Sequence, residues 1–398
     1  MVRLKFNARC KDVFLAAGLV GAFALVGSAV HGSEKEAPAK KAPAAASATP
    51  ATKVAVPKGD LPATMPSSGD DYVVVMTDKD DSSQKVFSKY LDKPESWRPL
   101  ADYNLLADGV KVRIPKAMLK PGILPAKITA FSGRVDIARK VDWKWIPAVP
   151  NLLVSEGDWI RTRDRSSAEI RQDDGTVVLL RPGTKLMFTT SGLAKTERGE
   201  IRVTKLTLES GAIASRVTKL RAQDSRFEIK TPTATSFIRG TEFRVKVEAE
   251  GTRLEVLEGA VDFGSEESHV SVASNSGSLA PTGAVTPVAP SALPERPTAL
   301  LTPEDRQVLD GEIAGYRFSW AAAPGATRYH VEIAADAEFR ELVDEQWVET
   351  SGADLAGFNV SDLDPGTYFW RVATINGAGY ESAWSDARHF VYPLRLKK

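Results

Sequence analysis

The chain has 398 residues, which is enough for two to four domains with separate cores. Its 52 basic and 51 acidic residues nearly balance, so no net charge attracts the protein to nucleic acid or to anionic lipid. The only cysteine, Cys10, lies close to the N-terminus. The rest of the chain therefore offers no disulfide framework, thiolate metal site or cysteine nucleophile.

Residues 1–32 have the pattern of a secretory signal peptide. A basic start is followed by the uncharged apolar run Val13–Val30 and by small residues near Gly32. The run is also close to the shortest length that spans a membrane, so an uncleaved anchor is the alternative. Both interpretations predict that the chain from Ser33 onward lies in the periplasm or cell envelope, with membrane contact only if the leader is retained.

Residues 33–70 are dominated by alanine, proline and lysine, with no aromatic residue and no apolar periodicity. Such a segment buries too little apolar surface to offset the entropy of ordering, so we predict a linker. A second segment, 273–297, is rich in serine, proline, alanine and glycine, and we predict a second connector there.

Residues 71–119 contain a short apolar strand, two stretches of helical spacing and the strand "VKVRIP". This order, with "W", "ADYN" and "DGVKVRIP" in its second half, resembles the LysM module, whose fold is βααβ. The loop "TDKDDSSQ" departs from the Gly-Asp-Thr-Leu stretch usual in that family. The resemblance implies binding of peptidoglycan, a glycan that contains N-acetylglucosamine, in a groove between two loops. The residues it implies for this groove are Thr77, Asp78, Lys79, Asn104, Leu105 and Leu106.

Residues 128–272 predict a long all-β domain. Turn sequences such as "SEGD", "QDDGT", "RPGT", "ERGE", "ESGA" and "AEGT" separate short runs at spacings typical of a sandwich, barrel or β-solenoid. In the hairpin around "AEGT", Phe243, Val245 and Val247 share one face. Leu254 and Val256 lie on the same face of the returning strand. Arg244 and Lys246 point to the other face.

Four blocks of this region resemble the FecR domain: "GDWIRTRDRSSAEIRQDDGTVVLLRPGTKLMF", "LESGAI", "FEIKTPTATSFIRGTEFRVKV" and "LEVLEGAVDF". FecR-type regulators relay an envelope signal to a sigma factor through an N-terminal cytoplasmic domain. Here only about 12 residues precede the apolar run, too few to fold. The resemblance therefore favours a sensor that acts through a partner over direct control of a sigma factor.

Residues 298–396 read as alternating strands separated by turns. Trp320, Tyr329, "PGTYFWRV" and "SAWS" resemble a fibronectin type III-like domain. The resemblance implies an immunoglobulin-like β-sandwich in which Trp320 and Tyr329 are core residues, and it implies nothing about function. The whole chain is thus predicted to be a mainly β, multidomain protein.

No catalytic or metal-binding constellation is evident. His269, His330 and His389 lack metal-ligand spacing, and we expect ordinary strand or loop histidines. Carboxylates alternate along strands and are expected on solvent faces. The acidic run 77–84 lacks the glycine and the later glutamate of an EF-hand loop, which favours a solvated loop over a calcium site. Trp143 and Trp145 lie on one strand face, where packing is favoured over sugar stacking.

Three functions remain to be weighed. A non-catalytic envelope protein that holds peptidoglycan and presents its β-domains to an unidentified envelope protein is favoured. A FecR-type sensor that acts through a partner is the alternative. A wall hydrolase is disfavoured because no segment is left to house a catalytic domain. We expect no cofactor and no metal.

Overall fold

The structure is a computed structural model. It describes residues 72–76, 83–97, 111–120, 126–140, 144–196, 199–219, 225–265, 267–309, 317–349, 352–354 and 363–393. The predicted signal peptide 1–32 and linker 33–70 lie outside these residues. Within the described segments, no helix is both long and apolar enough to cross a membrane.

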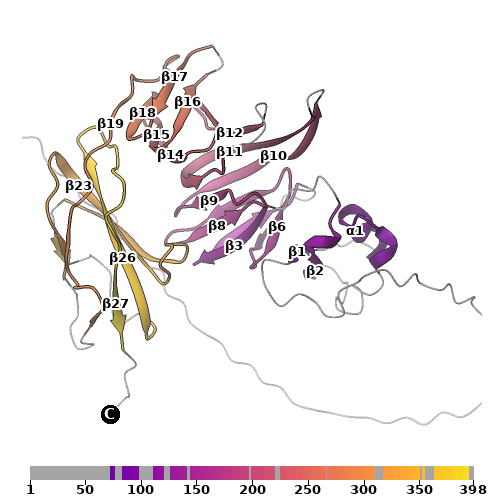
Figure 1. Cartoon of the computed structure of the whole chain (residues 1–398), viewed down its shortest axis with the longest axis horizontal. Helices are drawn as coiled ribbons and strands as arrows, with labels where there is room; N and C mark the ends of the chain where they lie inside the picture. The colour runs from indigo at the N-terminus through magenta and orange to yellow at the C-terminus, as the bar shows by residue number, and fades with distance from the viewer. Residues whose placement is uncertain are drawn as a thin grey trace, which may run out of the picture. The chain divides into compact units, whose positions relative to one another are not determined.

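The structure confirms that the protein is mainly β and built from several sheets (Figure 1). We call the larger part, β3 to β19, the central β-structure. Its first nine strands are β3 (Ala126–Ser132), β4 (Val135–Ala138), β5 (Trp145–Pro147), β6 (Leu152–Val154), β7 (Trp159–Thr162), β8 (Ser167–Arg171), β9 (Val177–Leu180), β10 (Lys185–Thr196) and β11 (Gly199–Arg216). The rest are β12 (Arg226–Lys230), β13 (Thr235–Ile238), β14 (Glu242–Glu248), β15 (Gly251–Glu258), β16 (Ala260–Gly264), β17 (His269–Ala273), β18 (Ser276–Pro281) and β19 (Ser291–Ala292). One hydrophobic core, with Ile170, Leu206 and Phe243 among its buried members, runs through this part.

The long strand β11 links two sets of strands in the central β-structure. Its first half pairs with β10 and β12, and its second half pairs with β9 and β14. The change occurs at Gly211, whose φ is 82° and where a Cβ atom would lie 2.5 Å from Thr184 Cα. The turn predicted at "ESGA" is therefore wrong: the chain continues as a strand there, and Gly211 supplies the bend and the close approach.

The hairpin of β14 and β15 has the predicted register. Val245 lies opposite Leu254 and Phe243 opposite Val256, and all four side chains are buried in the core. Arg244 is opposite Glu255 on the other face of the same pair. The alternation read from the sequence thus sets both faces of this hairpin.

The N-terminal described segment contains β1 (Tyr72–Met76), α1 (Ser83–Tyr90), the 3₁₀ helix η1 (Pro94–Trp97), β2 (Lys111–Pro115) and the 3₁₀ helix η2 (Lys116–Met118). Strands β1 and β2 pair antiparallel over a small core that includes Phe87 and Ile114. Strand β1 also touches the central β-structure, where the Val74 N–H donates to the Asn151 carbonyl at 2.7 Å. The βααβ fold of a LysM module is not shown by these elements and stays a prediction.

Part of the connector predicted at 273–297 is a strand. Strand β18 pairs with β15 from Gly251 opposite Pro281 to Val256 opposite Ser276, and β19 pairs with β18. The small residues that suggested a linker are what the position requires, because a Cβ on Gly277 would lie 2.5 Å from the ring of Tyr380. Composition therefore suggested a connector where part of the chain forms paired strands.

The C-terminal part consists of two sheets around a second core, and we call it the C-terminal sandwich. Its strands are β20 (Leu300–Thr302), β21 (Gln307–Val308), β22 (Arg317–Trp320), β23 (Ala326–Ala334), β24 (Leu342–Val348), β25 (Gly352–Asp354), β26 (Gly366–Asn376) and β27 (Arg388–Tyr392). The sheets are β20-β22-β25 and β21-β27-β26-β23-β24. Trp320 and Tyr329 are both buried and meet edge to face at 5.3 Å, so their predicted core positions are confirmed.

Candidate functional site: an ionic joint between two β-structures

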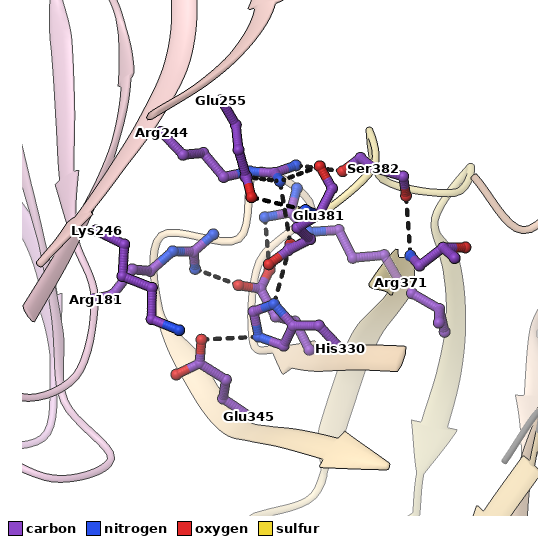
Figure 2. Close-up of polar contacts among 12 residues, drawn as sticks. Arg181, Arg244, Lys246, Glu255, His330, Glu345, Arg371, Glu381 and Ser382 are labelled. Atoms are coloured by element: carbon purple, nitrogen blue, oxygen red, sulfur yellow. Dashed lines mark hydrogen bonds and ion pairs between the residues drawn. The ribbon is translucent and has the colours of Figure 1, made fainter. Parts of the chain in front are cut away.

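Strand β23 presents two different faces. Tyr329, Val331 and Ile333 point into the core of the C-terminal sandwich. His330 and Glu332 alternate with them and point to the opposite face, where Glu332 contacts Arg181 of the central β-structure. Figure 2 shows His330 with its partners Glu345 and Glu381. Both are nevertheless buried, with 4% and 0% of their surfaces exposed. The expectation that such charged residues lie on a solvent face is therefore wrong for this strand.

Glu332 is held by two guanidinium groups from different parts of the molecule. Arg371, on the neighbouring strand β26, lies 2.6 Å from Oε2 through Nη2 and 2.7 Å through Nε. Arg181, in the turn after β9 of the central β-structure, contacts Oε1 through Nη1. The carboxylate thus ties the two β-structures together while its charge is fully compensated.

His330 contacts a carboxylate through each ring nitrogen. Nε2 lies 2.9 Å from Oε1 of Glu345 on β24, and Nδ1 lies 3.1 Å from Oε1 of Glu381, which follows β26. Trp347 stacks on the imidazole with ring centroids 4.6 Å apart and planes 15° apart. The ring is therefore fixed in position and in orientation.

Arg244 of β14 reaches from the central β-structure into the C-terminal sandwich. Its Nη1 lies 2.9 Å from Oε2 of Glu255 and 3.3 Å from Oε1 of Glu381. Its Nη2 donates to the Ser382 carbonyl at 2.7 Å. In return, the backbone N–H of Glu381 donates to Oε1 of Glu255 at 2.7 Å. Together these contacts cross between the two β-structures in both directions.

The segment after β26 is anchored locally, which explains why Glu381 is placed so closely. Asn376 Oδ1 accepts from the backbone N–H groups of Ala378 and Tyr380 at 3.1 and 3.0 Å. Ser382 Oγ accepts from the Thr374 N–H at 2.9 Å. These side-chain bonds stabilise an otherwise irregular turn.

Trp384, from the same segment, packs between the arginines. The guanidinium carbon of Arg371 lies 4.3 Å from its ring centroid, that of Arg244 5.5 Å and that of Arg181 6.0 Å. An aromatic ring attracts cations at its face and excludes water from their ion pairs. Trp384 therefore adds a favourable contact for the three guanidinium groups, whose charges are compensated by Glu255, Glu332 and Glu381.

We call the eight charged residues of this cluster the ionic joint. They are Arg181, Arg244, Glu255, His330, Glu332, Glu345, Arg371 and Glu381.

Burial and charge act on the titrating groups of the joint in opposite directions. Burial lowers the pKa of His330, but Glu381 and Glu345 outweigh it and raise the pKa to about 9. Burial raises the pKa of Glu255 to about 7, against the effect of Arg244. Burial opposes ionisation of Glu332, yet Arg181 and Arg371 hold its pKa below the ordinary value. Glu332 is therefore an anion at neutral pH and His330 a cation.

A second set of contacts lies beside the joint. Arg253 of β15 donates to the Ala378 carbonyl at 2.6 Å and lies over the ring of Tyr380. That ring packs on Gly277 of β18. A cleft of about 690 Å³ runs along the boundary of the two β-structures, and the half-exposed Trp347 is part of its wall.

Three residues of the joint have the composition of a metal site. In the described part of the chain, ligand atoms of His330, Glu332 and Glu345 lie within 4.8 Å of one another. A divalent ion needs a neutral histidine and free carboxylate oxygens. Glu332 is instead bonded to two guanidinium groups, and His330 lies between two carboxylates. The chemistry of these contacts fits an ion-pair cluster and does not fit a metal.

The residues predicted for a glycan groove lie outside the described segments. They are Thr77, Asp78, Lys79, Asn104, Leu105 and Leu106. Most of the acidic run 77–84 and Trp143 lie outside as well.

Of the remaining candidates, Trp145 has the guanidinium of Arg161 over its ring at 4.0 Å, which is a packing contact. His269 is in β17, and His389 of β27 pairs with Asp305 at 2.9 Å. The sequence missed the ionic joint because its members come from seven separate segments. The one available signal was the charged alternation in β14 and β23.

The fold and the joint define a protein of several linked β-sheets. Comparison with protein families adds that residues 158–262 match the FecR protein family, so this segment is a FecR domain. The match begins at Asp158 and ends in β16, and it contains Arg181, Arg244 and Glu255 of the joint. A search among curated proteins found no match.

Several solved structures are similar to parts of the chain. Two are crystal structures of a putative anti-sigma factor from Parabacteroides distasonis. The first is 20% identical to this chain. The similar region covers 34% of this chain and 59% of the other chain, with a TM-score of 0.27. The second is 17% identical, covers 48% and 85%, and has a TM-score of 0.29. A Fn3-like protein from Clostridium thermocellum is 22% identical, covers 27% and 100%, and has a TM-score of 0.20. The chain spans about three fifths of the first of these. TM-scores this low do not establish a shared overall fold.

Proposed function

We propose that this chain is a non-catalytic, exported cell-envelope protein that acts in FecR-type signalling by binding a protein partner. In this proposal the central β-structure and the C-terminal sandwich are presented to the partner as one unit. The FecR domain at 158–262 and the leader-like pattern at 1–32 support the class and the location.

The observation that carries the proposal is the ionic joint. Separate domains on flexible connectors move independently by default. Here buried, charge-compensated contacts such as Arg181–Glu332 and Arg244–Glu381 cross between the two β-structures. An event that a partner causes on one β-structure would therefore alter the other, which is what a relay requires.

A genetic complementation experiment tests this function. Deletion of the gene should change transcripts controlled by one alternative sigma factor, and crosslinking in the envelope should capture one partner protein on the full chain. Complementation with wild type or with Glu209→Gln, a change in an exposed ion pair, should restore the transcripts. Complementation with Glu332→Gln, which breaks the joint, should restore them poorly. Unchanged transcripts on deletion, together with the absence of a crosslinked partner, would contradict the proposal.

A second candidate function is retention on peptidoglycan by residues 71–119. The specific observation in its favour is the antiparallel pair β1–β2, which closes over its own core with α1. Because β1 also bonds to the central β-structure, deletion of this segment would disturb both parts.

Point variants in the predicted groove are therefore the better test of glycan binding. Full chain should sediment with insoluble peptidoglycan, and Thr77→Ala with Asn104→Ala should reduce the bound fraction. Lys144→Ala, a change outside the predicted groove, serves as the control. Wild-type protein that stays in the supernatant would remove this function.

A further inference from the structure

When all four carboxylates of the ionic joint are ionised, its charges balance only if His330 carries a proton. The cations are then Arg181, Arg244, His330 and Arg371, and the anions are Glu255, Glu332, Glu345 and Glu381. Without the proton, four carboxylates face three guanidinium groups in a site from which water is largely excluded. An uncompensated buried charge is among the most costly features in a protein.

The geometry of the imidazole leads to the same conclusion without reference to charge. A neutral imidazole donates a hydrogen bond from one ring nitrogen and accepts at the other, whereas imidazolium donates from both. Nε2 of His330 is hydrogen-bonded to Oε1 of Glu345 at 2.9 Å, and Nδ1 lies 3.1 Å from Oε1 of Glu381 in a contact outside hydrogen-bond geometry. In a neutral ring whose one proton is on Nε2, the lone pair of Nδ1 would lie beside the Glu381 oxygen, and this contact would be repulsive.

The groups that face His330 come from every element packed against it. Glu332 is on its own strand, Glu345 and Trp347 are on β24, and Glu381 and Trp384 follow β26. The facing cations are Arg371 on β26, Arg181 after β9, and Arg244 with Lys246 on β14.

The two β-structures have separate hydrophobic cores. The buried apolar residues of the central β-structure and those of the C-terminal sandwich form different clusters. Burial of apolar surface is the main source of stability in each. The joint can therefore open while both β-structures stay folded.

We propose that the ionic joint is a proton-dependent lock, in which the proton on His330 holds the C-terminal sandwich against the central β-structure and its loss releases the contact. This goes beyond the proposed function and does not depend on it.

The direction of the pH dependence follows from the raised pKa of His330. Its pKa in the folded protein, about 9, lies above its ordinary value of 6.5. The stabilisation is therefore complete below pH 6.5 and is lost as the pH rises through about 9. Glu255, whose pKa is raised to about 7, loses its proton at a lower pH than His330 does. Any change in stability that its ionisation causes therefore occurs near pH 7 and not near pH 9. The pKa of Arg371 is lowered to about 10, which sets the upper end of the useful range.

A distance measurement across the joint tests the lock. Spin labels at Ala273→Cys and Ala387→Cys, both exposed, are introduced into the full chain that also carries Cys10→Ser. Pulsed EPR should give a narrow distance distribution at pH 7.5 that broadens with a midpoint near pH 9. His330→Gln should give the broad distribution already at pH 7.5. His389→Gln, at a histidine of the same sandwich that pairs with Asp305 outside the joint, should behave like wild type.

Near-UV circular dichroism on the same samples reports whether each β-structure stays folded. If the His330→Gln variant loses this signal, the Glu345→Gln variant is used in its place. This change removes one partner of the imidazole and should lower the pH at which the distance distribution broadens. Distributions that stay narrow to pH 9.5 in wild type would overturn the proposal. So would a broadening that occurs only together with loss of the near-UV signal.

Discussion

Two clusters in this molecule surround a carboxylate with arginines, and they differ in what they connect. Asp136 of β4 is contacted by Arg161 at 2.9 Å and by Arg134 and Arg163 at 3.5 Å, all within the central β-structure. The side chains of Arg161, Arg134 and Arg163 are 23%, 72% and 44% exposed. In the ionic joint, Arg181, Arg244 and Arg371 are 9%, 11% and 16% exposed.

The difference shows that the same chemistry has two roles. Around Asp136 the carboxylate itself is buried, but water reaches the partly exposed arginines and screens their charges, so the cluster contributes little to stability. At the joint, water is replaced by Trp384 and by opposite charges, so the loss of any member leaves a buried ion without compensation. The cluster around Asp136 lies within one β-structure, whereas the ionic joint connects two β-structures.

The largest effect is expected from Glu332→Gln. The change keeps the shape of the side chain but leaves Arg181 and Arg371 without their anion, which should cost about 3 to 5 kcal/mol. Native-state hydrogen exchange on peptides from β23 and β26 measures the loss. Protection in β15 to β18 should change less. Exchange rates that match wild type in β23 would show that the joint contributes no stability.

A smaller loss should follow from Gly277→Ala. The added Cβ would lie 2.5 Å from the ring of Tyr380, and overpacking of this kind costs about 1 to 3 kcal/mol. Gly192→Ala is the matched control, because no atom lies within 4 Å of a Cβ there. Urea denaturation of both variants gives the comparison. Equal midpoints would mean that Tyr380 moves freely and that this contact does not hold the two β-structures.

Asp136→Asn should cost only about 1 kcal/mol, although three arginines lose their anion. Their exposure allows water to solvate them once the carboxylate is gone. Thermal unfolding followed by circular dichroism measures the change. A loss as large as that of Glu332→Gln would contradict the distinction between the two clusters.

The sequence predicted local pairing well and long-range polar contacts poorly. The register of Val245 with Leu254 follows from alternation, and the burial of Trp320 is what the fibronectin type III-like resemblance implies. The sequence also marked Arg244 as outward-facing, which is correct for its own sheet. The sequence pattern does not reveal that the outward faces of two sheets meet, because this contact depends on how the two β-structures pack against each other. For the same reason Gly277 suggested a connector, since its partner Tyr380 is far away in the sequence.

The smallest effect is expected from Glu209→Gln, which removes an ion pair on the surface of the central β-structure. Lys185 lies 2.8 Å from Glu209, and the two side chains are 35% and 49% exposed. Lys185 also keeps its place over the ring of Trp159 at 4.6 Å after the change. The cost should be below about 0.5 kcal/mol and should shrink at about 1 M salt, where the screening length falls to about 3 Å. Urea denaturation at low and high salt measures it, and the effect of Glu332→Gln should persist at high salt because its ions are shielded from solvent. A salt response of the same size in both variants would mean that water reaches the joint, and the contrast between the two kinds of cluster would then fail.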